Sequence, residues 1–236
     1  MWRMVLVAAH ALALVAEAPA APASPDRPGA RAEGQGEIVE EVVAVIRNPP
    51  TAPPRIITWT KLVEEARIAL VSRGATEAAA GTLDRAALRA ALEWLLDQTL
   101  VSDEAAKLRL DEVDREALRA ELRAFQARFP TFGQYERFLE RAEITEDELI
   151  ATLARMLRVE RYVQSRVGRS ARVGDDEVDR WLGERGAPVA PGVVRDAARS
   201  ELAERLAAKQ VRDLLAELRA RADIRIVGRL GAKDTL

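Results

Sequence analysis

Apolar side chains recur every three or four positions along most of this chain, which is the spacing of helices that bury one face. The pattern predicts a helix over residues 61–73, with Thr60 as its cap. A second helix is expected to begin at Thr82 or Asp84, and a third near Asp114. Polar residues fill the opposite faces, so these helices should pack against one another.

The second half of the chain continues the helical pattern. Pro130 is expected to end the third helix, and a short aromatic helix follows it. Thr145 and Glu148 have the spacing of a capping box, which predicts that a new helix begins there. Asp175 is expected to cap a brief helix, and residues 193–222 to form one long helix.

Three short segments have the β-branched, apolar composition of strands instead. Residues 37–46 and 55–59 are separated by a loop with four prolines, which predicts a loose hairpin. Residues 223–227 alternate polar and apolar side chains at the other end of the chain. Because a lone strand with an apolar edge needs a partner, we expect this segment to pair with the hairpin. The predicted fold is therefore mainly α, a helical bundle with a small sheet that joins both ends of the chain.

The first residues have the three parts of a secretory signal peptide, although a frayed apolar terminus of a cytosolic protein is the alternative. Arg3 supplies a positive charge, residues 5–16 form an uncharged apolar run, and small residues follow. The run is shorter than the roughly 20 residues of a membrane span, so we expect export without stable membrane insertion. Residues 1–20 are assigned to the signal and residues 21–36 to a disordered spacer. The candidate cleavage sites follow Ala18, Ala20 and Ala23.

Charge and side-chain chemistry narrow the class of function. The 38 acidic residues nearly balance the 36 basic ones, so no basic excess points to nucleic acid. The one histidine, His10, lies in the predicted signal peptide, and the chain contains no cysteine. The remaining chain would lack the usual ligands of zinc and copper, the commonest general base and the thiol nucleophile. We therefore expect no metal, no cofactor and no enzymatic activity.

Several short stretches of sequence stand in this order of elements: TKLVEEA at residues 60–66, ITEDEL at residues 144–149 and VGDDEV at residues 173–178. Together with the order of the elements, they resemble the N-terminal domain of the SurA family of periplasmic chaperones. The last helix with residues 223–227 resembles the segment that ends those proteins and docks back on the N-terminal domain.

The resemblance implies a division of the chain. Residues 37–182 would correspond to the helical chaperone domain, and residues 192–228 to the C-terminal helix and strand, with a tail at residues 229–236. Relatives carry one or two parvulin-type prolyl isomerase domains between these parts. Residues 183–191 leave room only for a linker, so isomerase activity is not expected here.

By the same resemblance, the chain would be a periplasmic chaperone that holds unfolded outer-membrane or exported polypeptides. Such a surface needs aromatic or Met side chains exposed beside charges. The candidate client contacts are Trp59, Phe125, Phe129, Phe132, Tyr135, Phe138, Met156 and Trp181. Helical spacing also suits core residues, and this interpretation is favoured for Phe125 and Phe129, as it is for Trp94.

The charged clusters are expected to be structural. Glu64 and Glu65, like residues 111–112 and 146–148, fall at helix starts or on solvent-facing sides, where acidic residues stabilise the helix dipole. Residues 166–172 carry three arginines and are expected to form a solvated connector, with acidic clients or lipid head groups as alternatives. The alternative function is a helical structural or regulatory module with one dedicated partner, which would bind through the last helix.

Overall fold

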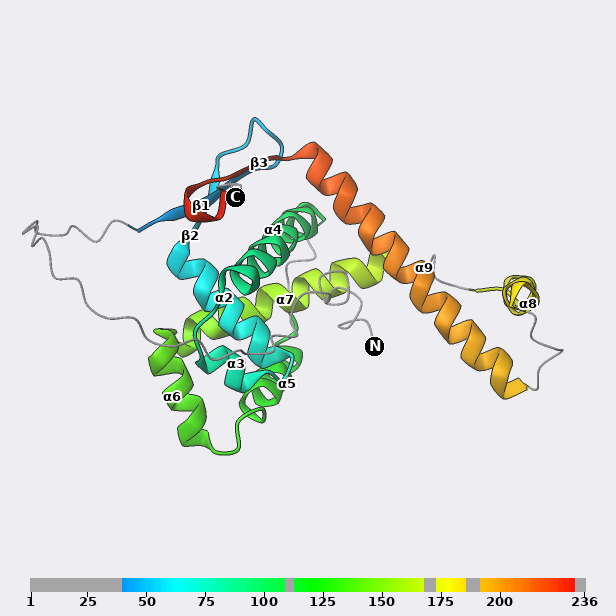
Figure 1. Cartoon of the computed structure of the whole chain (residues 1–236), viewed down its shortest axis with the longest axis horizontal. Coiled ribbons are helices and arrows are strands. Elements are labelled where there is room, and N and C mark those ends of the chain that lie inside the picture. Colours follow the sequence, from blue (N-terminus) through cyan, green and yellow to red (C-terminus); the bar gives the residue numbers. More distant parts are fainter. Residues whose placement is uncertain (1–39, 109–112, 168–172, 186–191, 232–236) are drawn as a thin grey trace, which may run out of the picture.

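The computed structural model describes residues 40–108, 113–167, 173–185 and 192–231, and it is mainly helical with one small sheet (Figure 1). The strands are β1 (Val42–Arg47), β2 (Arg55–Thr58) and β3 (Asp223–Ile226). The helices are α2 (Trp59–Ser72), α3 (Thr76–Ala80), α4 (Arg85–Lys107), α5 (Arg115–Gln126), α6 (Phe132–Ala142), α7 (Glu146–Val167), α8 (Asp175–Glu184), α9 (Gly192–Arg221) and α10 (Gly228–Gly231). The predicted fold class is confirmed. The predicted signal peptide and spacer lie outside the described residues.

The sheet joins the two ends of the described chain. β1 lies in the middle and pairs antiparallel with β2 on one side and with β3 on the other. Ala44 stands opposite Ile57 of β2 and Ile226 of β3, so these three side chains share a face. The main chain continues the contact beyond β3, since the amide of Val227 donates to the carbonyl of Val43 at 2.9 Å. The predicted pairing of the C-terminal strand with the N-terminal hairpin is therefore confirmed.

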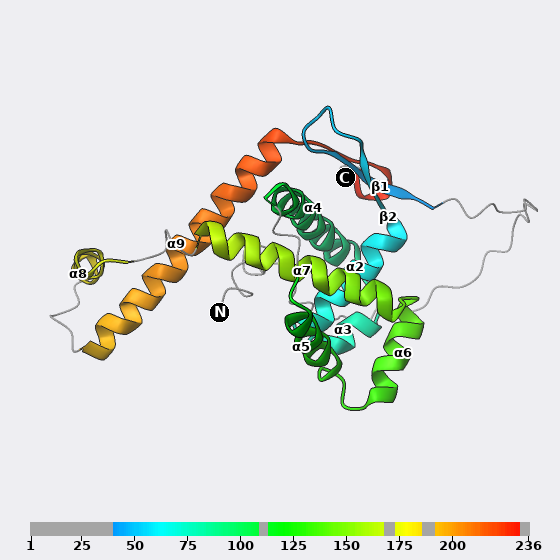
Figure 2. The same cartoon turned by 180° about the vertical axis from the view of Figure 1, so that it is seen from behind.

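A helical body lies below the sheet, with α2, α4 and α7 packed against one another (Figures 1 and 2). Its main core includes Leu62 of α2, Leu92 and Leu100 of α4, and Val163 of α7. The C-terminal half of α9 closes this core with Val211 and its apolar neighbours. Periodic apolar positions on each helix face the common centre, as the sequence pattern predicts.

A second core lies at the other end of the body, between α2, α3, α5, α6 and the start of α7. Ile68 and Val71 of α2 meet Phe125 of α5, Phe138 of α6 and Leu149 of α7. The two cores are contiguous, because Leu83 and Met156 pack against both of them. This second core contains four aromatic side chains, those of Phe125, Phe129, Tyr135 and Phe138.

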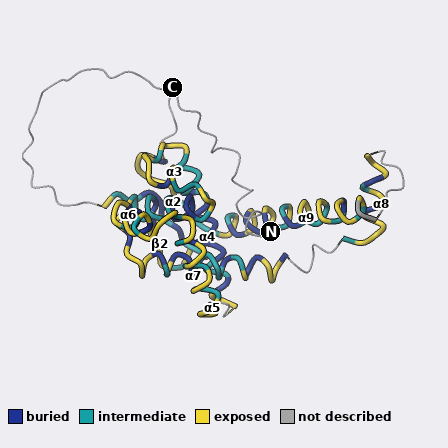
Figure 3. The backbone as a smooth tube through the Cα atoms, turned by 90° about the horizontal axis from the view of Figure 1, so that it is seen from below, coloured by how far each residue is buried: buried dark blue, intermediate teal, exposed yellow. Residues whose placement is uncertain are grey.

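An arm projects from the body, and it consists of α8 and the N-terminal half of α9 (Figure 3). Only a small apolar cluster of Val178, Leu182 and Ala198 joins these two helices. Ion pairs strengthen the joint, among them Arg195 with Asp179 at 2.5 Å. Burial along the arm is sparse compared with the body, as the colours of Figure 3 show.

Several predicted boundaries differ from the structure. Thr58, not Thr60, is the N-cap of α2, because its hydroxyl accepts from the amide of Lys61 at 3.4 Å. Trp59 is consequently the first helical residue and not the end of a strand. The third helix, α5, ends at Gln126, so Pro130 follows a turn and does not itself end the helix.

Other differences concern short elements. Gly174 takes the N-cap position of α8 that was predicted for Asp175, and the carboxylate of Glu177 accepts from its amide at 3.0 Å. α8 also continues to Glu184, so the linker predicted at residues 183–191 begins later. α3 and α10 were not predicted, because helices this short carry no periodic pattern.

Candidate functional site

The structure brings five of the eight predicted client contacts together at the junction of α5 and α6. The ring of Phe129 lies with its centroid 5.3 Å from Phe138 and 5.8 Å from Tyr135, and Phe125 lies 6.1 Å from Phe138. Phe132 joins the group through Tyr135 at 5.6 Å. The turn between the helices causes this meeting, because it folds the end of α5 back onto α6. We call these five residues the aromatic cluster.

Most of the aromatic cluster is core. Phe125 and Tyr135 are 2% exposed and Phe138 is 5% exposed, so their rings are already covered by the protein itself. Phe129 is partly buried, whereas Phe132 is 63% exposed at the first position of α6. A ligand can therefore reach Phe132 and the edge of the cluster, but it cannot reach most of the rings.

The other three predicted contacts lie elsewhere. Trp59 packs at the edge of the main core, and the guanidinium of Arg229 covers its ring at 4.0 Å. Trp181 belongs to the arm, where Arg185 stacks on it at 3.7 Å. Met156 is partly buried between the two cores. These three residues do not form a common surface with the aromatic cluster. Trp94, predicted to be core, is buried.

A groove runs between α3 and α6 beside the aromatic cluster, with a volume of about 340 Å³. Its apolar lining is Ala80, Phe129, Pro130 and Phe138. Phe129 and Phe138 thus connect the groove to the aromatic cluster, and Phe132 lies on the same turn of chain as Pro130. We call this hollow the α3–α6 groove.

Charged side chains form the rest of the lining. Arg137 and Arg141 come from α6 and Arg67 comes from α2, while Glu77 of α3 is the acidic residue of the lining. The Nη1 atom of Arg67 donates to the carbonyl of Ala79 near the end of α3. Thr76 and Gln134 add polar groups that can form hydrogen bonds. The α3–α6 groove therefore combines an apolar wall with an excess of positive charge.

Tyr135 shows how the aromatic cluster is anchored. Its hydroxyl donates to the carboxylate of Glu146 at 3.4 Å, at the start of α7. Burial raises the pKa of the Tyr135 hydroxyl, so it remains protonated and serves as a donor. The contact is structural, since it holds α6 against α7.

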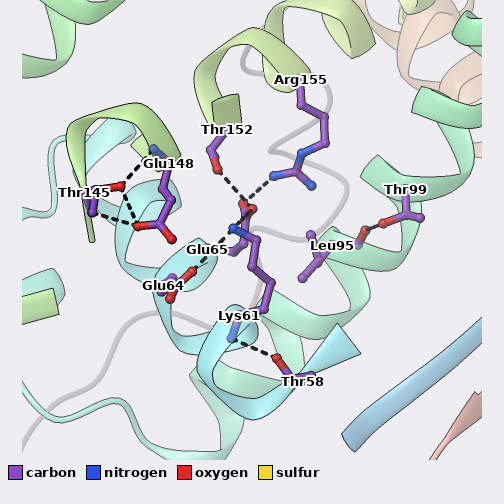
Figure 4. A network of polar contacts seen from close by, with 10 residues as sticks. All are labelled: Thr58, Lys61, Glu64, Glu65, Leu95, Thr99, Thr145, Glu148, Thr152 and Arg155. Carbon is purple, nitrogen blue, oxygen red and sulfur yellow. Dashed lines mark hydrogen bonds and ion pairs between the residues drawn. The ribbon is translucent and has the colours of Figure 1, made fainter. Parts of the chain in front are cut away.

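A buried charged network was missed by the sequence analysis (Figure 4). Glu65 is 1% exposed, so its placement on a solvent-facing side was wrong. The hydroxyl of Thr152 donates to its carboxylate at 3.1 Å, Arg155 pairs with it, and Lys61 lies 3.3 Å away. Glu65 lies three residues after Leu62, on the apolar side of α2, and this position was the available signal. The network fastens α2 to α7.

A second network fastens α9 to α4. Arg219 donates from Nε to Asp97 at 2.6 Å and from Nη1 to Glu93 at 2.6 Å. Asp97 is 2% exposed, although nothing in the sequence analysis marked it. The clusters at residues 111–112 lie outside the described residues, as does most of the basic segment at 166–172. Residues 146–148 form the exposed first turn of α7, as expected.

Neither a metal-ligand cluster nor a membrane-spanning helix is found among the described residues. Among them, no group of three or more His, Cys, Asp or Glu side chains is placed to hold a metal ion. Within the same ranges, no helix has both the length and the apolar character to cross a membrane. The candidate site in this part of the chain is the α3–α6 groove, which has apolar and cationic walls.

In comparisons with protein families, with curated proteins and with solved structures, none matches this chain.

Proposed function

We propose that this protein is a non-enzymatic periplasmic chaperone that holds extended, partly apolar segments of exported or outer-membrane polypeptides. The observation that carries the proposal is the α3–α6 groove, which has an apolar wall and a charged rim; the exposed ring of Phe132 belongs to the aromatic cluster that supplies part of this wall. An apolar surface rimmed by charge can accept many sequences, because neither part demands one partner geometry. Binding should be weak, since an unfolded client must be ordered when it binds.

The pairing of the C-terminal strand with the N-terminal hairpin also supports this proposal. The resemblance to the SurA family implies that the C-terminal strand docks on the N-terminal hairpin, and β3 pairs with β1 in that way. Residues 185–191, between α8 and α9, are too few for a parvulin domain, so the proposed chaperone has no isomerase domain at this place in the chain. Its function would be to keep clients from aggregating.

The proposal is tested by suppression of aggregation with several unrelated unfolded outer-membrane proteins. We expect Phe132→Ser to weaken client binding about fivefold, because roughly 1 kcal/mol of apolar burial is lost at this side chain. The matched control is Leu108→Ser at the end of α4, a similarly exposed apolar residue (57%, against 63% for Phe132). It should change client binding little. Equal effects of the two substitutions, or no suppression by the wild type, would contradict the proposal.

A second function is favoured by the arm. The arm exposes Val194, which is 44% exposed, and only a small cluster holds α8 to α9. A projecting helix pair of this kind can serve as the contact for one dedicated partner. A single tight partner, together with no suppression of client aggregation, would favour this module over the chaperone.

A further inference from the structure

The cationic residues on the α6 side of the α3–α6 groove have no ion-pair partner among the described residues. Arg137 and Arg141 lie four residues apart, so they share one side of the helix and repel each other. Some other arginines of the body do meet carboxylates, as Arg155 meets Glu65 and Arg219 meets Asp97. Two neighbouring guanidinium groups that line a groove without such partners are suited to an anionic ligand.

Arg67 adds a third positive charge to the groove. Its Nη1 atom donates to the carbonyl of Ala79, which holds the guanidinium at the α3 side, while its buried Nε has no hydrogen-bond partner. Glu77 is the one acidic residue of the lining, and no ion pair ties it to the arginines within the described ranges. Three arginines against one glutamate leave the lining with an excess of two positive charges.

The apolar wall determines what else a ligand needs. Phe129, Pro130 and Phe138 line the groove beside the arginines, so an anion alone would leave this wall uncovered. The volume of about 340 Å³ is at the lower end of the range for ligand pockets, which suits a few side chains of an extended chain.

We propose that the α3–α6 groove selects polypeptide segments in which acidic side chains flank an apolar one. The carboxylates would face Arg137 and Arg141, and the apolar side chain would cover Phe129 and Phe138. This inference rests on the proposed function, because it names the class of segment that the chaperone prefers. Charge complementarity provides the selection, and the apolar contact keeps it tolerant of sequence.

The experiment compares two short fluorescent peptides with the same leucines, one with flanking Glu residues and one with Gln in their place. Fluorescence anisotropy with the full-length mature protein should give about fivefold tighter binding of the Glu peptide, as expected for two partly exposed ion pairs. This preference should shrink when salt is added, because the charges are screened. The double variant R137Q/R141Q should bind both peptides with the affinity that the wild type has for the Gln peptide.

A matched control removes two exposed arginines outside the groove. R180Q/R212Q changes the net charge by the same amount but should keep the preference for the Glu peptide, because Arg180 lies on α8 and Arg212 on α9. Equal binding of both peptides by the wild type, or a preference that survives in R137Q/R141Q, would overturn the inference.

The same variants separate this inference from the proposed function. If R137Q/R141Q still suppresses aggregation of neutral clients while the preference is lost, both proposals stand. If the wild type suppresses aggregation but shows no preference, the selection of acidic segments fails and the chaperone proposal remains. If the wild type neither binds a peptide nor suppresses aggregation, both fail.

Discussion

A buried charged residue, Glu65, connects two helices of the body through its ion pairs and hydrogen bonds. Glu65 contributes an acidic side chain to a site that is 1% exposed, and such a charge is costly unless partners surround it. Thr152, Arg155 and Lys61 supply these partners from α7 and from α2 itself. Because the partners lie on two helices, the network also determines how α2 and α7 are aligned.

Neutralising this carboxylate should destabilise the fold. We expect Glu65→Gln to lower the free energy of unfolding by about 3 kcal/mol, because Arg155 would keep a largely buried charge without a counter-charge. Urea unfolding followed by circular dichroism measures the change. Glu136→Gln, at an exposed position on α6, should stay within about 0.5 kcal/mol of the wild type.

A double variant distinguishes the pair from simple packing. Replacing both partners by apolar side chains, in E65L/R155M, should recover much of the loss, since neither charge is then left alone. A Glu65→Gln protein that unfolds at the same urea concentration as the wild type would show that the network contributes nothing.

Elements begin where local sequence provides a cap. The side chains of Asp84, Asp114 and Thr131 accept backbone hydrogen bonds at the starts of α4, α5 and α6. At the start of α7, Glu148 donates its amide to Thr145 at 3.3 Å, and its carboxylate accepts from the amide of Thr145 at 2.8 Å. This reciprocal pair is the predicted capping box.

The capping box makes stability depend on pH. Hydrogen bonds from the amide and the hydroxyl of Thr145 lower the pKa of Glu148 below its ordinary value of 4.5. The stabilisation is thus fully present above pH 4.5 and is lost as the pH falls through the lowered pKa. Glu148→Gln should therefore unfold more easily than the wild type at neutral pH, and the difference should vanish in acid, because Gln resembles the protonated side chain. Urea unfolding of both proteins at a series of pH values measures this difference in the free energy of unfolding. A difference that stays constant from neutral to acid pH would contradict the prediction.

At the scale of the whole molecule, the two ends of the described chain close over the body. Glu41, just before β1, accepts from the Nε atom of Arg229 at 2.8 Å, and Arg229 also covers the ring of Trp59. This bond to Arg229 lowers the pKa of Glu41. Gly228, the residue before Arg229, has a φ of 63°, which residues other than glycine rarely adopt.

Gly228 should therefore be sensitive to substitution. A Cβ atom there would lie 2.7 Å from a carboxylate oxygen of Glu41, so Gly228→Ala should destabilise the docked tail by about 1–2 kcal/mol. Hydrogen exchange at residues 223–231 should accelerate, and urea unfolding should report the loss. Gly183→Ala is the control, because a Cβ in that open helical position meets nothing within 4 Å. It should stabilise α8 by about 0.5–1 kcal/mol, and equal effects at both glycines would contradict the explanation.

The sequence by itself determined the parts of the structure that depend on neighbours along the chain. Periodic apolar positions and caps such as Asp84 and Asp114 predicted the long helices, and strand composition predicted the three strands. The pairing of β3 with the N-terminal hairpin could also be predicted from the sequence, because an unpaired strand at one end of the chain needed a partner at the other.

Only the tertiary structure decided which side chains are covered. An aromatic residue at helical spacing can belong to a core or to a binding surface, and packing buried Tyr135 and Phe138 while leaving Phe132 exposed. Glu65 became an internal ion pair because Arg155, ninety residues away, meets it across the body. The α3–α6 groove needed residues from α2, α3, the α5–α6 turn and α6. The burial of a side chain and the shape of a groove depend on many contacts between residues that are distant in the sequence. No local sequence pattern specifies these contacts.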